Sequence, residues 1–167
     1  MSQIRTNSIV PSGGVVAGAT GGGIIQVVQD FITTSASTTS TSLVQTGLSA
    51  TITPRSTSNK ILIWVNGIGS AGGTDQVAFQ MRRGTGTNIA NQATSINFSS
   101  QVTCAVCEGQ RTRQPLNFCL LDEPGTTSAT TYHLYWRTSS GTGLIGRWGV
   151  DDNWRQSTNL TLMEISG

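Results

Sequence analysis

The sequence predicts an all-β protein: an antiparallel β-sandwich of the jelly-roll type with an extended N-terminal arm. Three observations favour this fold class. β-branched and aromatic residues recur in short runs, turn-forming Gly, Ser, Asn and Pro separate the runs, and no stretch has clear helical periodicity. Roughly eight or nine runs follow one another at regular spacing, which is typical of a sandwich. A chain of 167 residues is long enough for one domain with a substantial core.

Residues 1–23 are the expected arm, and residues 24–167 are the expected sandwich domain. The arm is rich in glycine and contains a single charged residue, Arg5. Glycine-rich backbone loses the most entropy when it becomes ordered, so an arm of this composition needs a partner to hold it in place. We therefore expect another protein chain to bind the arm. The predicted anchoring residues are Ile4, Arg5, Ile9, Val10 and Pro11.

The first predicted strands follow the arm directly. Ile24–Val28 is the first run of β-branched residues, and Leu43–Ile52 contains the second, with apolar residues at alternate positions. Thr33–Ser42 lies between these two runs and consists almost entirely of Ser and Thr. This stretch is either a linker or a strand that faces solvent.

Lys60–Val65 is apolar on both faces, which predicts a central strand buried on both sides, with Trp64 in the core. Pro54–Asn59 supplies the turn before this strand, and the glycines of Gly67–Gly73 are expected to end it.

The second half of the domain continues the pattern. Val77, Phe79 and Met81 alternate with other residues and predict a half-buried strand. Asp122–Gly125 has the composition of a tight turn. The remaining predicted strands lie at Ile96–Phe98, Val102–Val106, Leu116–Leu120, Thr131–Thr138, Leu144–Trp148 and Leu160–Ile165.

Six segments form an ordered set along the chain: Ile4–Pro11, Thr46–Pro54, Ser58–Ile63, Phe79–Gly84, Asp122–Tyr132 and Leu160–Ile165. In this order they resemble bacteriophage tail-fibre-like and virion surface structural proteins, a family of small domains. No shared motif is found over Cys104–Gln114. The resemblance implies a place on the virion, with assembly in the host cytoplasm. It also implies contacts with other virion proteins and a homotrimeric state.

Composition argues against several other classes of protein. Charged residues make up 11% of the chain and the formal net charge is +2, which does not indicate binding to nucleic acid or to an acidic membrane. No apolar run reaches the ~18–20 residues of a membrane helix, and the N-terminus lacks the pattern of a signal peptide, so we expect neither a membrane protein nor secretion. The three cysteines do not suggest a disulfide framework or a metal site. We expect Cys104, Cys107 and Cys119 to be small buried residues in strands.

The titratable residues do not predict catalysis. His133 is the single histidine, and alternation places it on the outer face of its strand with Tyr135 and Arg137, as a surface or interface residue. Asp122 and Glu123 are explained by their turn. We expect no enzyme activity, no cofactor and no bound metal.

One short segment is a candidate glycan site. Aromatic rings can stack on the apolar face of a sugar while carboxylates and amides bind its hydroxyl groups. Two alternatives stay open: the tryptophans cap the sandwich or fill a subunit interface, and the Asp and Asn oxygens lie in an ordinary loop or bind calcium. The residues are Trp148, Asp151, Asp152, Asn153 and Trp154.

Two functional classes follow from these observations. The first is a non-enzymatic bacteriophage virion protein, either a fibre-like surface appendage or a capsid-decorating protein, anchored by its N-terminal arm. The alternative is a glycan-binding adhesin module that recognises the host surface.

Overall fold

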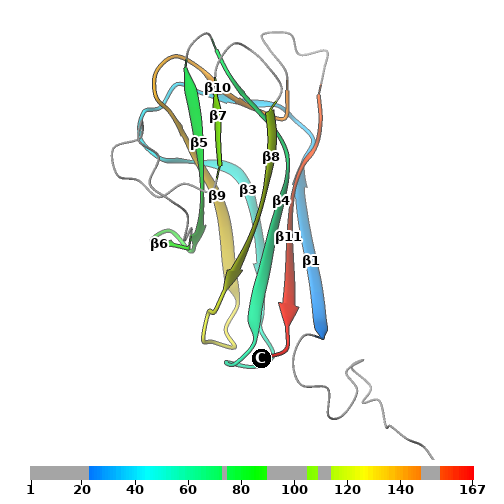
Figure 1. The fold of residues 1–167 in the computed structure, drawn as a ribbon. Helices are drawn as coiled ribbons and strands as arrows, with labels where there is room; N and C mark the ends of the chain where they lie inside the picture. Colours follow the sequence, from blue (N-terminus) through cyan, green and yellow to red (C-terminus); the bar gives the residue numbers. More distant parts are fainter. Residues whose placement is uncertain (1–22, 73–74, 90–104, 109–113, 148–154) are drawn as a thin grey trace, which may run out of the picture.

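The computed structural model describes residues 23–72, 75–89, 105–108, 114–147 and 155–167, and these ranges contain strands but no helix (Figure 1). The predicted anchoring arm and the predicted glycan segment lie outside the described residues. The strands are β1 (Ile24–Ile32), β2 (Ala36–Thr38), β3 (Val44–Ile52), β4 (Lys60–Ala71), β5 (Gln76–Arg83), β6 (Thr87–Asn88), β7 (Ala105–Glu108), β8 (Gln114–Asp122), β9 (Thr130–Thr138), β10 (Gly143–Ile145) and β11 (Thr158–Ile165).

The strands form two antiparallel sheets that pack face to face (Figure 1). In the first sheet, β1, β11, β4 and β8 lie side by side in this order, and the short strands β10 and β2 extend from β4 at one end. In the second sheet the order is β3-β9-β5, and β6 and β7 both pair with β5. At the edges of the sandwich, β1 contacts β3 and β8 contacts β7.

The pairing of the eight principal strands defines a jelly roll. Counted along the chain, the first of these strands (β1) pairs with the last (β11), and the second (β3) pairs with the seventh (β9). The third (β4) pairs with the sixth (β8), and the fourth (β5) pairs with the fifth (β7). This is the pairing of one long antiparallel ribbon that folds over on itself. The additional pairs β11–β4 and β9–β5 join the folded ribbon into two sheets. The predicted all-β jelly-roll sandwich is therefore confirmed.

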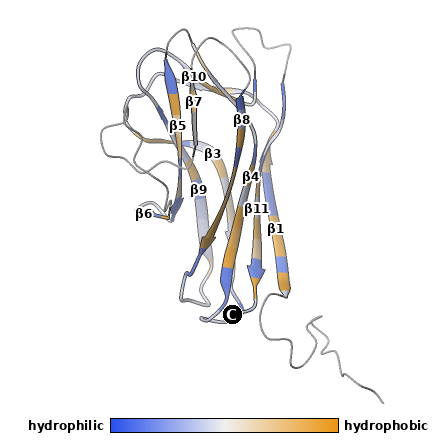
Figure 2. Ribbon diagram, in the orientation of Figure 1, coloured by the Kyte–Doolittle hydropathy of each residue, from blue (hydrophilic) through white to orange (hydrophobic). Residues whose placement is uncertain are grey.

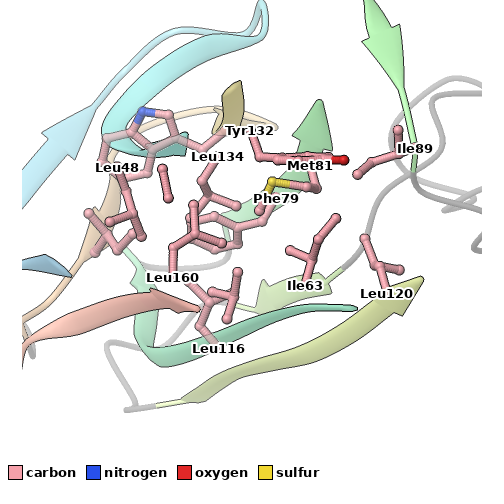
Figure 3. Close-up of a cluster of buried hydrophobic side chains, with 14 of the residues drawn as sticks. Leu48, Ile63, Phe79, Met81, Ile89, Leu116, Leu120, Tyr132, Leu134 and Leu160 are labelled. Carbon is pink, nitrogen blue, oxygen red and sulfur yellow. The ribbon is translucent and has the colours of Figure 1, made fainter. Parts of the chain in front are cut away.

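The core lies between the sheets, where every second residue of each long strand points inward. On β4, Ile61, Ile63 and Val65 are completely buried. On the opposite sheet, Phe79 of β5 stacks on its cross-strand partner Trp136 of β9, with ring centroids 6.2 Å apart. Figure 3 shows the cluster around these rings, which includes Leu48, Met81, Leu116, Leu134 and Leu160.

Strand β4 is longer than predicted, because its glycines continue the strand. The expected break at Gly67 is wrong, and β4 runs on to Ala71. A Cβ atom at Gly67 would lie 2.6 Å from Thr158 Oγ1, and one at Gly69 would lie 2.7 Å from Cys107 Sγ. Glycine is therefore required here by the close approach of neighbouring side chains.

Two of the wrong burial predictions concern β4 and β5, and both arise because the residue pattern of one strand does not reveal which of its faces is covered. Trp64 is 50% exposed instead of lying in the core, since it alternates with buried Ile63 and Val65 and so points out of the sandwich. The strand around Phe79, expected to be half-buried, is buried on both faces: Ala78 is 0% and Gln80 only 3% exposed.

Most other predicted strands are found near their expected positions. The Ser/Thr-rich stretch contains the short strand β2, so its solvent-facing strand alternative is partly confirmed. The predicted turn at Asp122–Gly125 follows β8, and Gly125 has a positive φ of 63°. Ile96 and Phe98 lie outside the described residues, as does the beginning of the strand predicted at Val102–Val106.

A buried polar cluster ties the two sheets together. The hydroxyl group of Tyr132, on β9, donates a 2.7 Å hydrogen bond to Asp122 Oδ2, on β8. Arg83 Nη1, on β5, donates to the same oxygen over 3.0 Å. Burial raises the pKa of the Tyr132 hydroxyl far above its usual range, and the hydrogen bond and charge of Asp122 add to this effect. The hydroxyl therefore remains a donor.

A second polar cluster fixes the end of the domain from which residues 1–22 leave. Glu164 of β11 is completely buried. It accepts hydrogen bonds from Asn59 Nδ2 (2.6 Å), Gln26 Nε2 (2.5 Å) and the backbone N–H of Arg55 (2.6 Å). Beside this cluster, the backbone N–H of Ser166 donates to the carbonyl of Gly23 over 3.0 Å. The start of β1 is thus held against the end of β11.

Candidate interaction surface

The outer face of the sheet β1-β11-β4-β8 is the most distinctive surface in the described part of the chain. Directly paired residues of neighbouring strands share a face, so the register and the alternation of burial identify the outward side chains. We call this surface the open face. Its residues are Ile24, Val27, Gln29 and Phe31 of β1, Asn159, Thr161, Met163 and Ile165 of β11, Lys60, Leu62, Trp64 and Asn66 of β4, and Asn117, Cys119 and Leu121 of β8.

The open face holds most of the exposed apolar surface. Six large apolar side chains are exposed within the described ranges, and all but Val44 lie on this face: Ile24, Val27, Phe31, Trp64 and Leu121, each between 48% and 57% exposed. One apolar row crosses all four strands, because Val27 pairs with Met163, Met163 with Leu62, and Leu62 with Leu121. In Figure 2, apolar segments are visible along β1, β4 and β8 of this sheet.

Trp64 stands at the centre of the open face beside a shallow hollow. It pairs with Thr161 on one side and with Cys119 on the other, both in the row next to the apolar row. The hollow has a volume of about 400 Å³. It is lined by Leu62, Trp64, Asn117, Phe118 and Cys119. The surface therefore combines a large ring with an adjacent depression.

Two pairs of polar residues on the open face are joined by hydrogen bonds. Gln29 Nε2 donates to Thr161 Oγ1 over 3.0 Å, and Asn66 Nδ2 donates to Asn117 Oδ1 over 2.9 Å. Lys60 is the single charged residue of the face as defined, and its ammonium group lies 2.6 Å from Glu123 Oε1. The open face is consequently almost neutral, and these amide side chains already have a partner.

The outer face of the opposite sheet differs in character. Gln45 Nε2 donates to the Tyr135 hydroxyl over 2.9 Å, and the Arg82 guanidinium lies 4.8 Å from the centre of the Tyr135 ring. His133 packs edge-on against the same ring, with centroids 6.4 Å apart. Because Leu134 and Trp136 are buried, the predicted placement of His133 on the outer face with Tyr135 and Arg137 is confirmed. This second face is polar and carries charge.

A polar pocket of about 370 Å³ lies at one end of the sandwich, beside the Asp122 cluster. Its lining combines one cation, two carboxylates, hydroxyl and amide groups, and two aliphatic side chains: Arg83, Asp122, Glu123, Thr87, Asn88, Ile89 and Leu121. The sequence prediction assigned Asp122 and Glu123 to a turn alone. It missed this pocket, because the pocket is assembled from two segments, residues 83–89 and 121–123, that are distant in the sequence.

The two described cysteines have opposite environments. Cys107 is completely buried, and burial raises the pKa of its thiol to about 12. Cys119 is exposed on the open face, so the prediction that it is buried is wrong. The predicted burial of Cys107 is confirmed, whereas Cys104 lies outside the described residues.

None of the predicted site residues lies within the described ranges. The glycan candidates Trp148, Asp151, Asp152, Asn153 and Trp154 and the arm residues Ile4, Arg5, Ile9, Val10 and Pro11 all fall outside them. In the part of the chain that is described, no cluster of three metal-ligating side chains is present. The same part contains no helix that could cross a membrane.

Comparison with known proteins identifies no family for this chain. No protein-family model matches the sequence, and no curated protein sequence matches it. A solved structure of infectious bursal disease virus, Gx strain, contains a similar chain, with a TM-score of 0.39 and 13% sequence identity. The match covers 97% of this chain but only 44% of the viral chain. A likeness at this level carries no information about function.

Proposed function

We propose that the chain is a non-enzymatic structural protein of a bacteriophage virion, held in the particle by its N-terminal arm. In this role it is either a fibre-like surface appendage or a capsid-decorating protein. The resemblance of six ordered segments, from Ile4–Pro11 to Leu160–Ile165, supports the phage assignment. The jelly-roll fold is compatible with it, since this architecture is used by viral capsid domains and by lectins.

The observation that carries the proposal is the open face. Soluble monomers rarely expose a contiguous apolar surface of this kind, because the solvent-exposed area favours association. The centres of protein interfaces are depleted in charge and enriched in Trp, Phe and Met, and Trp64, Phe31 and Met163 occupy this face. Such a surface fits a subunit that is buried in an assembly.

The geometry at Gly23 supports an anchoring role for the residues before it. Because Gly23 is bonded to Ser166, residues 1–22 leave the domain from a fixed point at one end of the sandwich. An extended arm of about 22 residues can span several tens of ångströms. Such an arm can add as a strand to the sheet of a neighbouring subunit. We propose other virion proteins as its partners and a homotrimer as the assembled state.

A glycan-binding adhesin is the second candidate, and the polar pocket favours it. Arg83, Asp122 and Asn88 offer hydrogen-bonding groups beside the aliphatic side chain of Leu121, a combination that suits a sugar ring. The adhesin role predicts glycan binding by the intact chain. It also predicts that Asp152→Ala or Trp154→Ala, in the segment proposed from sequence, abolishes that binding without unfolding the domain.

The test of the structural role is incorporation of an arm-deleted chain into particles. A variant lacking residues 2–23 is compared with the full chain for folding by circular dichroism and for its amount in purified virions. We expect the shortened domain to fold and to be lost from the particles. Normal incorporation of the folded, shortened domain would contradict the anchoring role.

A further inference from the structure

We propose that the open face is the surface through which copies of this chain associate, so that Trp64 of one copy is buried by the open face of another. The inference deepens the proposed function and rests on it in one respect: a virion subunit is expected to assemble. The location of the contact follows from the structure alone. It is the outer face of β1, β11, β4 and β8, centred on Trp64 and the apolar row beside it.

The nearly neutral charge of the open face favours a partner whose surface is also nearly neutral. The open face is neutral, since the charge of Lys60 at its end is paired with Glu123. A nucleic acid, an acidic peptide or an anionic membrane would find no complementary charge on this surface. A surface that is equally neutral and apolar is its natural complement. Among the described surfaces of this chain, the open face itself has that character, whereas the opposite sheet carries Arg82, His133 and Arg137.

The shape of the open face is compatible with contact between copies. In the proposed homotrimer, each open face gives its projecting group to one neighbouring copy and receives that of the other, so the same face must carry both the group and the cavity that receives it. Trp64 is a half-exposed ring, and the hollow beside it is lined by Leu62, Phe118 and Cys119. Seating the ring of one copy in the hollow of the next buries both the ring and the lining of the hollow.

The open face is large enough for a stable contact. Four strands spaced ~4.8 Å apart, each contributing about eight residues at ~3.3 Å, give a flat footprint of roughly 500 Å². Counted on both partners, this footprint gives about 1,000 Å², which is the lower limit for a specific interface. Burial of the apolar side chains in this area, which include Val27, Phe31 and Leu121, supplies the binding free energy.

Two hydrogen bonds within the open face reduce the cost of removing water from it. Burying an unpaired amide on association costs free energy, because its hydrogen bonds to water are lost. Here Gln29 bonds to Thr161, and Asn66 bonds to Asn117. These two hydrogen bonds are kept when a second copy covers them, which lowers the cost of desolvation at these four residues.

The test is sedimentation velocity of the full chain at about 1 and about 100 µM, because association makes the apparent mass depend on concentration. We expect the wild-type chain to be oligomeric at the higher concentration. Trp64→Arg and Leu121→Arg place a charge on two different strands of the open face, and each is expected to weaken association at least about tenfold. Val44→Arg is the matched control, since Val44 is an exposed apolar residue outside this face, and it should associate like the wild type.

Cys119 provides a second readout that does not depend on hydrodynamics. Its thiol is exposed in one copy and pairs across the strands with Trp64, so association should slow its reaction with a thiol reagent at least about tenfold. The Cys119→Ser variant shows which part of the thiol reaction comes from Cys119. Circular dichroism confirms that each variant is folded.

A wild-type chain that is monomeric at both concentrations would overturn the inference, as would folded Trp64→Arg and Leu121→Arg variants that associate normally. The proposed function is tested separately, by measuring whether the chain is present in virions. A chain that is present in particles but does not associate through this face contradicts the inference alone. A chain that associates in this way but is absent from particles contradicts the virion role alone.

Discussion

Trp64 on β4 and Cys119 on β8 are direct cross-strand partners, and both side chains point out of the sandwich. The immediate neighbours of Trp64 along the chain, Ile63 and Val65, are completely buried. One strand therefore supplies the core with one set of apolar residues and solvent with another. Apolar residues on the solvent-exposed face of a strand are unusual in a free monomer. For this reason we infer that the open face is an association surface.

The hydrogen bond from Tyr132 to Asp122 should contribute measurably to stability. Tyr132→Phe removes the hydroxyl that bridges the two sheets and leaves the buried carboxylate with one partner fewer. Hydrogen bonds to charged groups contribute about 1.5–3 kcal/mol, so we expect a loss of this size in the free energy of unfolding, measured by urea titration. Tyr135→Phe removes a bond to the neutral Gln45, and its smaller expected loss, about 1 kcal/mol, serves as the control. Equal losses in the two variants would contradict this account.

Glu164 should make the stability of the domain depend on acid pH. Burial raises the pKa of its carboxyl group, but hydrogen bonds from Asn59, Gln26 and the backbone of Arg55, together with the charge of Arg55, outweigh this effect. The pKa in the folded state therefore lies below its ordinary value of 4.5. Since the folded state binds this proton less readily than the unfolded state, the carboxylate stabilises the fold above about pH 4.5. This contribution is lost as the pH falls through the lowered pKa.

The variant Glu164→Gln tests this dependence. At pH 7 we expect it to unfold with a free energy about 1–3 kcal/mol lower than the wild type, because the buried charged acceptor is gone. The difference should shrink as the pH is lowered toward about 3. Glu123→Gln, at an exposed position, is the control. A difference between wild type and Glu164→Gln that stays constant over this range would contradict the assignment.

Gly69 should resist even the smallest side chain. A Cβ atom there would lie 2.7 Å from Cys107 Sγ and 3.1 Å from the Phe79 ring. Such crowding in a packed core costs about 1–3 kcal/mol, so Gly69→Ala should lower the midpoint of urea unfolding. Gly86→Ala, with no neighbour within 4 Å of the added carbon, should have almost no effect. Adding Cys107→Ala to Gly69→Ala removes the clashing sulfur, and the pair should cost less than the sum of the two single changes.

Cys107 should be chemically silent in the folded protein. Because burial raises the pKa of its thiol to about 12, almost no thiolate exists at neutral pH, and the group is also shielded from reagents. In a Cys104→Ser background, one thiol should react in the native state at low protein concentration, and the second only when urea unfolds the domain. Cys119→Ser in the same background should remove the fast phase. Two fast thiols would show that the core around Cys107 opens readily.

Sequence patterns predicted the strands well where one face is apolar and the other is not. In β8, the alternation of Leu116, Phe118 and Leu120 predicted the strand, and Leu116 and Leu120 are buried while Asn117 between them is exposed. The turn after Asp122 was equally clear, because Gly125 adopts the positive φ that favours glycine.

The failures have a common physical origin. A run such as Ile61 to Val65 is apolar on both faces. This pattern alone does not distinguish a strand that is buried on both faces from one whose outer face is exposed in a single copy of the chain. The placement of Trp64 was wrong for this reason. The continuation of β4 through Gly67 and Gly69 was missed because their close neighbours, Thr158 and Cys107, come from distant parts of the sequence. The polar pocket at Arg83 depends on long-range pairing in the same way.

The central claim is that this chain is a structural component of a phage particle, and its copy number in purified virions tests the claim most directly. Particles are separated from free protein on a density gradient, and the chain is quantified against the major capsid protein by mass spectrometry. We predict a fixed number of copies per particle, in a multiple of three as the proposed homotrimer requires. Particles that are complete and infectious but contain no detectable copy of this chain would contradict the account.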